Sequence, residues 1–379
     1  MFREITCNIS TADGAYFRGL VDRLSDLGHD ARFYESLLDG LSDETLKCVY
    51  STFTFICQKY VRCMGKEGKV SELPFSIGLI WHHSAMKIGV KPSTTYAALV
   101  LNNWQFVSPE AAALGVVSLD SITTTYTMTG SQDEEWFYKI HVVAEAVGAE
   151  MLHQVVDGSA SDEALAHMLA KYAVNLRLIA DTIKRMNEHC DPDYFWNNIR
   201  CYLSGNDKPQ DGSGPLSIAG SDITIGYAGG SGAQSTLFQV ADEFLGVRHE
   251  VAHAREVLVS ARSFMPAPHL AFLARVKQHC VRARALASRD ERLQRAYNEC
   301  VAALTQFRKQ HSVLVHRYVL RFIDASAAAL QRGDVETYES LQRANVNGSG
   351  GTGGTHELSK LIDALVTDTA AAAPRLWRG

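Results

Sequence analysis

The segment HEVAH, residues 249–253, fits the H-E-x-x-H signature of zinc proteases. In those enzymes two histidines one helical turn apart bind zinc, and the glutamate acts as a general base. At about 100° per residue, His249 and His253 fall opposite the apolar stripe of an expected helix over residues 242–261. A remote third ligand is missing from the downstream sequence, so the pattern favours a solvated helix face over a zinc site.

A further histidine falls inside an apolar stripe. In the segment TQFRKQHSVLVHRYVLRF, His311 shares a helical face with Phe307, Tyr318 and Phe322, whereas His316 points towards water. A histidine in that position is either a hydrogen-bonded core residue or an axial ligand of haem iron within a helical domain. The pattern alone leaves both interpretations open.

Helices must position these side chains, because helical periodicity dominates the chain. Apolar residues recur three and four apart in DRLSDLGHDARFYESLLDGLSDETLKCVYSTFTFICQKYV and in much of the remainder. Asp191 and Pro192 form a typical helix start, and SDITIGY is the best strand candidate. We predict an all-α fold with a small helical domain over residues 1–100 and a larger one over residues 101–379.

Composition narrows the class of protein. The net charge of -5 provides no field that attracts nucleic acid. The sequence contains no apolar run near the 18 residues that span a bilayer, and MFREITCNIS lacks the apolar core of a signal peptide. The eight cysteines form no C-x-x-C pair and indicate reduced thiols. We expect a cytoplasmic protein that binds neither nucleic acid nor a membrane.

Six segments, in the order in which the family carries them, resemble the indoleamine 2,3-dioxygenase family. Its members are haem enzymes that open the indole ring of tryptophan. The segments are TTYAALVLNNW (94–104), DPDYFWNNIRCYLSG (191–205), YAGGSGAQSTLFQ (227–239), SFMPAPHLAFL (263–273), FRKQHSVLVHRYVL (307–320) and GTGGT (351–355). They extend over roughly residues 70–365, whereas the first 60 residues match poorly. The resemblance implies haem b as cofactor, with His311 as the ligand of its iron.

The same resemblance implies a substrate pocket. Arg200 matches an arginine that grips the substrate carboxylate, for which a planar guanidinium is suited; on its residue type alone it would be a surface salt bridge. Phe195, Tyr96, Leu99 and Phe137 match residues that line the indole pocket. Without the resemblance, these four would be assigned to the core.

One position departs from the animal members of the family. His141 stands where they carry serine, and in this it is similar to tryptophan 2,3-dioxygenases. A neutral imidazole there could accept a hydrogen bond from the indole N–H, or act as a base near neutral pH. The alternative is a core histidine with its hydrogen bonds satisfied.

Two glycine-rich stretches complete the expected site. Gly229, Gly230 and Gly232 would let the backbone approach the haem and offer N–H groups to a propionate, with Ser231 near the dioxygen. The stretch 348–355 reads as a linker by composition. In the family the equivalent loop closes over the substrate, which implies that Thr352 orders the substrate's ammonium group.

The implied reaction inserts both atoms of dioxygen across the indole C2–C3 bond of L-tryptophan, or of a close indole derivative, giving N-formylkynurenine. Three alternatives remain: a tailoring oxygenase acting on a substituted tryptophan or indole, a non-catalytic haem protein that senses or stores a gas, and the zinc protease. The sequence leaves open the substituent preference and the oligomeric state.

Overall fold

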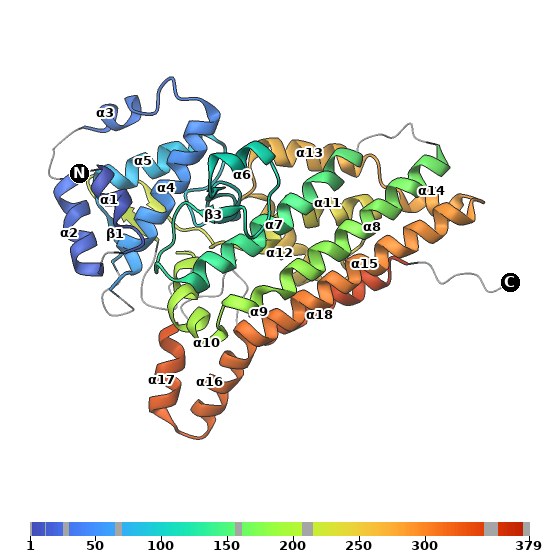
Figure 1. The fold of residues 1–379 in the computed structure, drawn as a ribbon. Coiled ribbons are helices and arrows are strands. Elements are labelled where there is room, and N and C mark those ends of the chain that lie inside the picture. Colours follow the sequence, from blue (N-terminus) through green and yellow to red (C-terminus); the bar gives the residue numbers. More distant parts are fainter. Residues whose placement is uncertain are drawn as a thin grey trace.

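The computed structural model describes residues 2–11, 13–25, 30–64, 70–155, 161–206, 215–344 and 355–373. Helices dominate these residues, and each strand is only two or three residues long. The predicted all-α class is therefore confirmed. In Figure 1 the N-terminal helices gather at one end, and long helices run from there to the opposite end.

The N-terminal elements are α1 (Phe2–Cys7), α2 (Gly14–Ser25), α3 (Ala31–Ser36), α4 (Asp43–Arg62), β1 (Glu72–Leu73), α5 (Phe75–Lys87), the π-helical turn η1 (Ala97–Leu101), β2 (Trp104–Phe106), α6 (Pro109–Leu114) and β3 (Ile122–Thr124). The central elements are α7 (Gln132–Gln154), α8 (Asp162–Lys184), α9 (Met186–His189), α10 (Pro192–Tyr194), the π-helical turn η2 (Phe195–Ile199), the 3-10 turn η3 (Arg200–Leu203), β4 (Leu216–Ile218), β5 (Thr224–Ile225), the 3-10 turn η5 (Gly232–Gln234) and α11 (Thr236–Leu245). The C-terminal elements are α12 (Ala252–Arg262), α13 (Ala267–Lys277), α14 (Arg282–Ala287), α15 (Glu291–Val315), the π-helical turn η6 (His316–Leu320), α16 (Arg321–Gln331), α17 (Val335–Ala344) and α18 (Thr355–Ala370).

The long helices α7, α8, α15 and α18 form the scaffold of the larger end (Figure 1). Polar caps fix where two of them begin: the Ser131 hydroxyl accepts the Glu134 N–H, and the Ser161 hydroxyl accepts the Ala164 N–H. Helix α8 packs along α15 through fully buried side chains such as Leu176. Each such burial stabilises the fold by roughly 1.5–3 kcal/mol.

Long-range contacts join the N-terminal helices to the middle of the chain. Strand β1 pairs in parallel with β4, which pairs antiparallel with β5, so the strand predicted within SDITIGY is confirmed. Strands β2 and β3 form a separate antiparallel pair. From α4, the buried Arg62 donates to the carbonyl oxygen of Gly205 at 2.8 Å and to Asn206 Oδ1 at 3.0 Å. The turn at 203–206 is thereby tied to the N-terminal helices.

The division into two domains at residue 100 stays a prediction. Residue 100 lies within η1, and one hydrophobic core continues from Ile5 to Ala372. In the described ranges, no helix combines the length and apolar character that a bilayer span requires.

Candidate active site

The HEVAH segment does not lie on a single helix, so the helix predicted over residues 242–261 is wrong. Helix α11 ends at Leu245, because Gly246 adopts a left-handed conformation with φ of 67° that glycine accepts without strain. The next helix starts only at Ala252. Between them the chain turns back on itself and carries His249 inwards.

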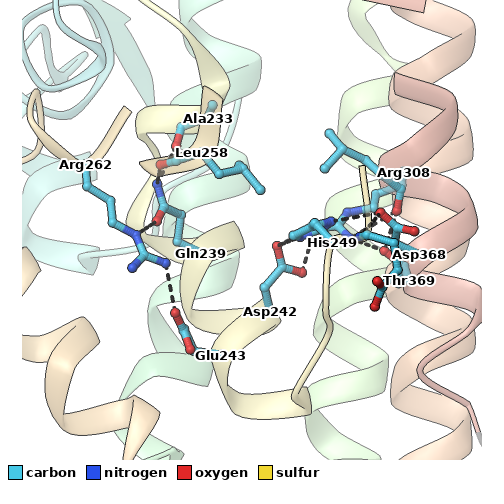
Figure 2. Close-up of polar contacts among 12 residues, drawn as sticks. Ala233, Gln239, Asp242, Glu243, His249, Leu258, Arg262, Arg308, Asp368 and Thr369 are labelled. Atoms are coloured by element: carbon cyan, nitrogen blue, oxygen red, sulfur yellow. Dashed lines mark hydrogen bonds and ion pairs between the residues drawn. The ribbon is translucent and has the colours of Figure 1, made fainter. Parts of the chain in front are cut away.

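His249 is buried among charges instead of lying on a solvated face (Figure 2). Its Nε2 lies 3.1 Å from Asp242 Oδ2, and its Nδ1 lies 3.5 Å from Asp368 Oδ2. Arg308 reaches both carboxylate oxygens of Asp242 at 2.6 Å. Burial acts to raise the pKa of Asp242, but Arg308 and His249 outweigh it and the net pKa is lowered.

This cluster is an ion-pair network rather than a zinc site. The guanidinium of Arg308 already pairs with the Asp242 carboxylate, whereas a zinc ion would need this carboxylate as a free ligand. Within the part of the chain that the structure describes, no three His, Cys, Asp or Glu side chains form a group that could hold a metal ion. The network joins α11, α15 and α18, and its Arg308 precedes His311 by about one helical turn on α15.

Among the described residues, π-helical turns occur at η1, η2 and η6, and all of them border the predicted pocket. Turns η1 and η2 pack against α7, and η2 also packs against η6. Such turns insert an extra residue into a helix and are frequent at functional sites. They carry Leu99, Phe195 and Tyr318.

His311 lies on α15 with its ring beside an aromatic stack. Its ring continues a stack in which Phe238 and Phe307 lie 4.3 Å apart, with 6.2 Å between the Phe307 and His311 centroids. The side chain is exposed by area, yet desolvation lowers its pKa to about 4. His311 is therefore not a covered core residue, and its imidazole is neutral.

His141 lies in electrostatic reach of His311, because a protonated His141 would repel a protonated His311 and so helps to lower the pKa of His311. Its Nδ1 lies 2.7 Å from the carbonyl oxygen of Phe137. We assign Nδ1 as the N–H donor in this bond, which leaves Nε2 with a lone pair. Burial lowers the pKa of His141, although the Phe137 carbonyl opposes the shift, so the ring is neutral near pH 7.

Aromatic rings surround His141. The Phe137 centroid lies 4.6 Å from the His141 ring and 5.0 Å from Phe195, and Tyr96 lies edge-on to His141 at 6.2 Å. Leu99 is buried beside Gly230, where an added Cβ would come within 2.9 Å of Leu99 Cδ1. The structure thus brings Tyr96, Leu99, Phe137 and Phe195 to one region.

Arg200 is buried, so the alternative of a surface salt bridge is wrong. Its side chain is 2% exposed, and its guanidinium lies 4.7 Å from the centre of the Trp196 ring. Burial lowers the pKa of Arg200 to about 10, and the Cys201 thiol opposes this shift. The backbone N–H of Arg200 bonds to the Phe195 carbonyl, so one π turn places this cation next to an aromatic wall. A buried guanidinium in that position can bind a carboxylate.

The glycine-rich loop differs in part from its predicted role. A Cβ on Gly229 would lie 2.1 Å from the Leu203 carbonyl oxygen, and one on Gly230 would lie 2.6 Å from that of Thr94. Packing against protein backbone requires glycine at both positions, and their predicted role in holding a cofactor stays a prediction. At Gly232 an added Cβ would meet nothing within 4 Å, so this side of the loop is open.

The hydroxyl of Ser231 is held within the same loop. Its Oγ accepts the Ala233 N–H at 3.2 Å, while the N–H groups of Gln234 and Ser235 bond to carbonyl oxygens of the turn. Of the N–H groups predicted to meet a propionate, that of Gly230 already bonds to the Leu203 carbonyl oxygen at 3.2 Å. Thr352 lies outside the described residues.

A matched pair of substitutions tests the loop. Gly229→Ala should lower the free energy of unfolding by about 1–3 kcal/mol or more, because its methyl group would overlap the Leu203 carbonyl. Gly232→Ala should change it by less than about 1 kcal/mol, since the same methyl group meets open space. Urea unfolding of both variants measures the difference, and equal effects would contradict this account of the packing.

Sequence reasoning missed Glu145, which lies one helical turn after His141 on α7. Its Oε1 accepts the Ser235 hydroxyl at 2.5 Å and the Tyr96 hydroxyl at 3.0 Å. The sequence feature that could have pointed to Glu145 is its i, i+4 spacing from His141. Its partners lie far away in the sequence, so no local pattern could reveal them.

These features suit a flat, largely apolar group that carries a metal. His311 offers a neutral, accessible imidazole on α15 that could bind a metal, an added Cβ at Gly232 would meet nothing within 4 Å, and the aromatic rings of Phe137 and Tyr96 lie against His141. The fold and these residues therefore suit an all-helical protein that binds such a group. More specifically, the chain belongs to the indoleamine 2,3-dioxygenase family: the family model described as "Indoleamine 2,3-dioxygenase" matches residues 36–372.

Individual relatives agree with this family. The chain is 28% identical over 322 residues to human "Indoleamine 2,3-dioxygenase 2", covering 83% of this chain and 76% of the relative. It is 27% identical over 349 residues to "6-hydroxytryptophan 2,3-dioxygenase fscD" of Fusarium equiseti, covering 88% and 83%. It is also 29% identical over 295 residues to "Myoglobin" of the abalone Haliotis madaka, covering 76% and 74%.

Proposed function

We propose that this protein is a haem-dependent dioxygenase that inserts both atoms of dioxygen across the indole C2–C3 bond of L-tryptophan, or a close derivative. The product would be N-formylkynurenine. The observation that carries the proposal is the arrangement of His141: an imidazole with a free lone pair at Nε2 lies between aromatic rings and within electrostatic reach of His311.

His311 would hold the haem b iron through one ring nitrogen. Its lowered pKa keeps that nitrogen unprotonated and able to bind a metal. The stack with Phe307 and Phe238 restricts the tilt of the imidazole. The open side of the loop at Gly232 would leave room for the edge of the porphyrin. When bound, haem b supplies the dioxygen chemistry of the reaction.

The remaining residues would bind and orient the indole. Arg200 would pair with the substrate carboxylate, and Phe137 and Phe195 would pack against the ring faces. Tyr96 and Leu99 would close the far wall of the pocket. Exclusion of water by these apolar walls strengthens every polar contact made inside.

His141 would accept the indole N–H at its Nε2. The hydrogen bond between Nδ1 and the Phe137 carbonyl fixes the tautomer that leaves this acceptor free. The contact orients the indole, and a neutral imidazole can also take a proton from it. We further propose that Ser231 lies near the dioxygen and that Thr352 contacts the ammonium group of the substrate.

The His141 contact predicts a preference and a pH profile. Replacing His141 with alanine should lower kcat/KM for L-tryptophan about three- to tenfold, which corresponds to the loss of one hydrogen bond. The kcat/KM for 1-methyltryptophan should stay unchanged. Because burial lowers the pKa of His141 from 6.5, wild-type kcat/KM should stay level from pH 8 down to 6.5 and fall only below it. Steady-state rates on both substrates across this range test the assignment, which fails if the alanine variant slows both substrates equally.

A second candidate is a tailoring oxygenase that acts on a substituted tryptophan. His141 favours it, because the residue differs from the serine implied by the animal members, and a relative is named a 6-hydroxytryptophan 2,3-dioxygenase. A gas-binding role without catalysis is a third candidate, given the relative named myoglobin. The buried cation of Arg200 argues against that role, since binding a diatomic gas requires no carboxylate anchor.

Single-turnover chemistry separates these candidates. The reduced haem protein would be mixed with L-tryptophan and ¹⁸O-labelled dioxygen, and the product identified by mass. N-formylkynurenine with both oxygen atoms labelled supports the proposal. Conversion of 6-hydroxytryptophan but not of tryptophan supports the tailoring enzyme, and reversible oxygen binding without either product supports the gas-binding protein.

A further inference from the structure

Glu145 joins three separate segments around the candidate pocket. It lies on α7, accepts the Tyr96 hydroxyl at 3.0 Å from the start of η1, and accepts the Ser235 hydroxyl at 2.5 Å from the start of α11. Both donors reach the same oxygen, Oε1. The carboxyl group therefore fixes the spacing between α7 and the two segments opposite it.

The position of Glu145 relates it directly to His141. The two residues are one turn apart on α7, so their side chains share a helical face. Tyr96 contacts both, through its hydroxyl to Glu145 and through its ring edge to His141. Burial raises the pKa of Glu145, although the hydrogen bonds from Ser235 and Tyr96 oppose this shift.

Tyr96 is fixed at both ends. Its backbone N–H donates to Gln234 Oε1 at 2.8 Å, and Gln234 Nε2 donates to the Gly229 carbonyl oxygen at 2.9 Å. These bonds hold the backbone of Tyr96 against the glycine-rich loop. Only the bond to Glu145 holds the hydroxyl end of the ring among the described contacts. Without it, the ring could rotate while the backbone stays in place.

We propose that Glu145 is a positioning residue that sets the distance between the Tyr96 wall and His141, and so the fit of the indole in the pocket. The proposal deepens the proposed function and rests on it for its kinetic test. Glu145 itself need not touch the substrate. It acts through Tyr96 on one side and through the start of α11 on the other.

This role predicts a change in binding rather than in the chemical step. A wall that contacts the indole contributes equally to the bound substrate and to the transition state, so loosening it raises KM and leaves kcat nearly unchanged. A glutamine retains a carbonyl oxygen that both hydroxyls can reach. An alanine offers neither hydroxyl a hydrogen-bond acceptor.

The test compares the single variants Glu145→Ala, Glu145→Gln and Tyr96→Phe with the double variant that combines Glu145→Ala and Tyr96→Phe. We expect Glu145→Ala to raise KM for L-tryptophan about tenfold with kcat within about threefold, and Glu145→Gln to keep both within about threefold. Adding Tyr96→Phe to Glu145→Ala should raise KM no further, because the hydroxyl has already lost its partner. A fall in kcat at unchanged KM, or effects of the two substitutions that multiply, would overturn the proposal.

Urea unfolding of the same proteins separates this proposal from the proposed function, because it needs no turnover. The unfolding midpoint of the double variant should equal that of Glu145→Ala alone. If the wild-type protein leaves tryptophan unchanged but the midpoints are non-additive, the link between Glu145 and Tyr96 stands and the proposed reaction fails. Additive midpoints refute the link whatever the activity.

Discussion

His311→Ala is expected to be purified without haem. Changes in residues that merely support a metal ligand cost about 10–100-fold in metal affinity, so loss of the ligand itself should lower haem occupancy by more than about tenfold. The rest of the fold should persist, because the His311 side chain is exposed and makes no side-chain hydrogen bond to any described residue. The Soret absorbance per polypeptide and the iron content measure the occupancy.

The same helical segment supplies a matched control. His316 is also exposed, and it begins η6 only five residues further on. His316→Ala should keep the haem occupancy and the spectrum of the wild type. A His311→Gly variant that regains a Soret band with added imidazole would show that the lost group is the ligand. Full haem occupancy in His311→Ala would remove His311 from this role.

Local patterns predicted the elements that depend on local chemistry. The Asp191 side chain accepts the Tyr194 N–H, and Pro192 follows at the first helical position, as the sequence indicated. Phe307 and His311 also stack along α15, as their i, i+4 spacing indicated. Short-range hydrogen bonds and side-chain periodicity are properties of neighbouring residues, so they can be read directly from the chain.

The sequence could not predict features that depend on contacts between distant segments. Gly246 ends α11, which a continuous apolar stripe does not reveal, and the turn after it buries His249 against Asp242 and Asp368. An isolated helical wheel assigns such a histidine to solvent, because the wheel contains no partner charges. Gly229 illustrates the same limit: its requirement for glycine comes from the Leu203 carbonyl in another segment.

The π turns show why the pocket was harder to predict than the helices. An extra residue within a turn shifts the faces on either side of it, so a constant period of 3.6 misplaces the side chains that follow. Phe195 and Arg200 are separated by five residues, and the π-type bond between them brings that spacing to about one turn. The resemblance to a family identified these two residues, whereas the residue type of Arg200 alone would have assigned it to a surface salt bridge.

Arg200→Leu is expected to lower kcat/KM for L-tryptophan by about 10–150-fold, which corresponds to roughly 1.5–3 kcal/mol for a hydrogen bond to a charged group. Arg200→Lys should recover only part of the loss, because an ammonium group keeps the charge but lacks the planar fork that grips both carboxylate oxygens. Steady-state kinetics on L-tryptophan and on tryptamine, which lacks the carboxylate, measure the effect. The preference for tryptophan over tryptamine should collapse in the leucine variant.

Arg321→Lys is the matched control for Arg200. Arg321 also lies over an aromatic ring, 4.3 Å from the centre of Phe322, but it is exposed and pairs with Asp193 at 2.8 Å. A salt bridge between exposed side chains contributes little to stability. The Arg321→Lys variant should therefore convert both substrates as the wild type does. If Arg200→Leu slows tryptophan and tryptamine equally, its stacking on Trp196 is what the reaction requires, and the carboxylate must be bound by another residue.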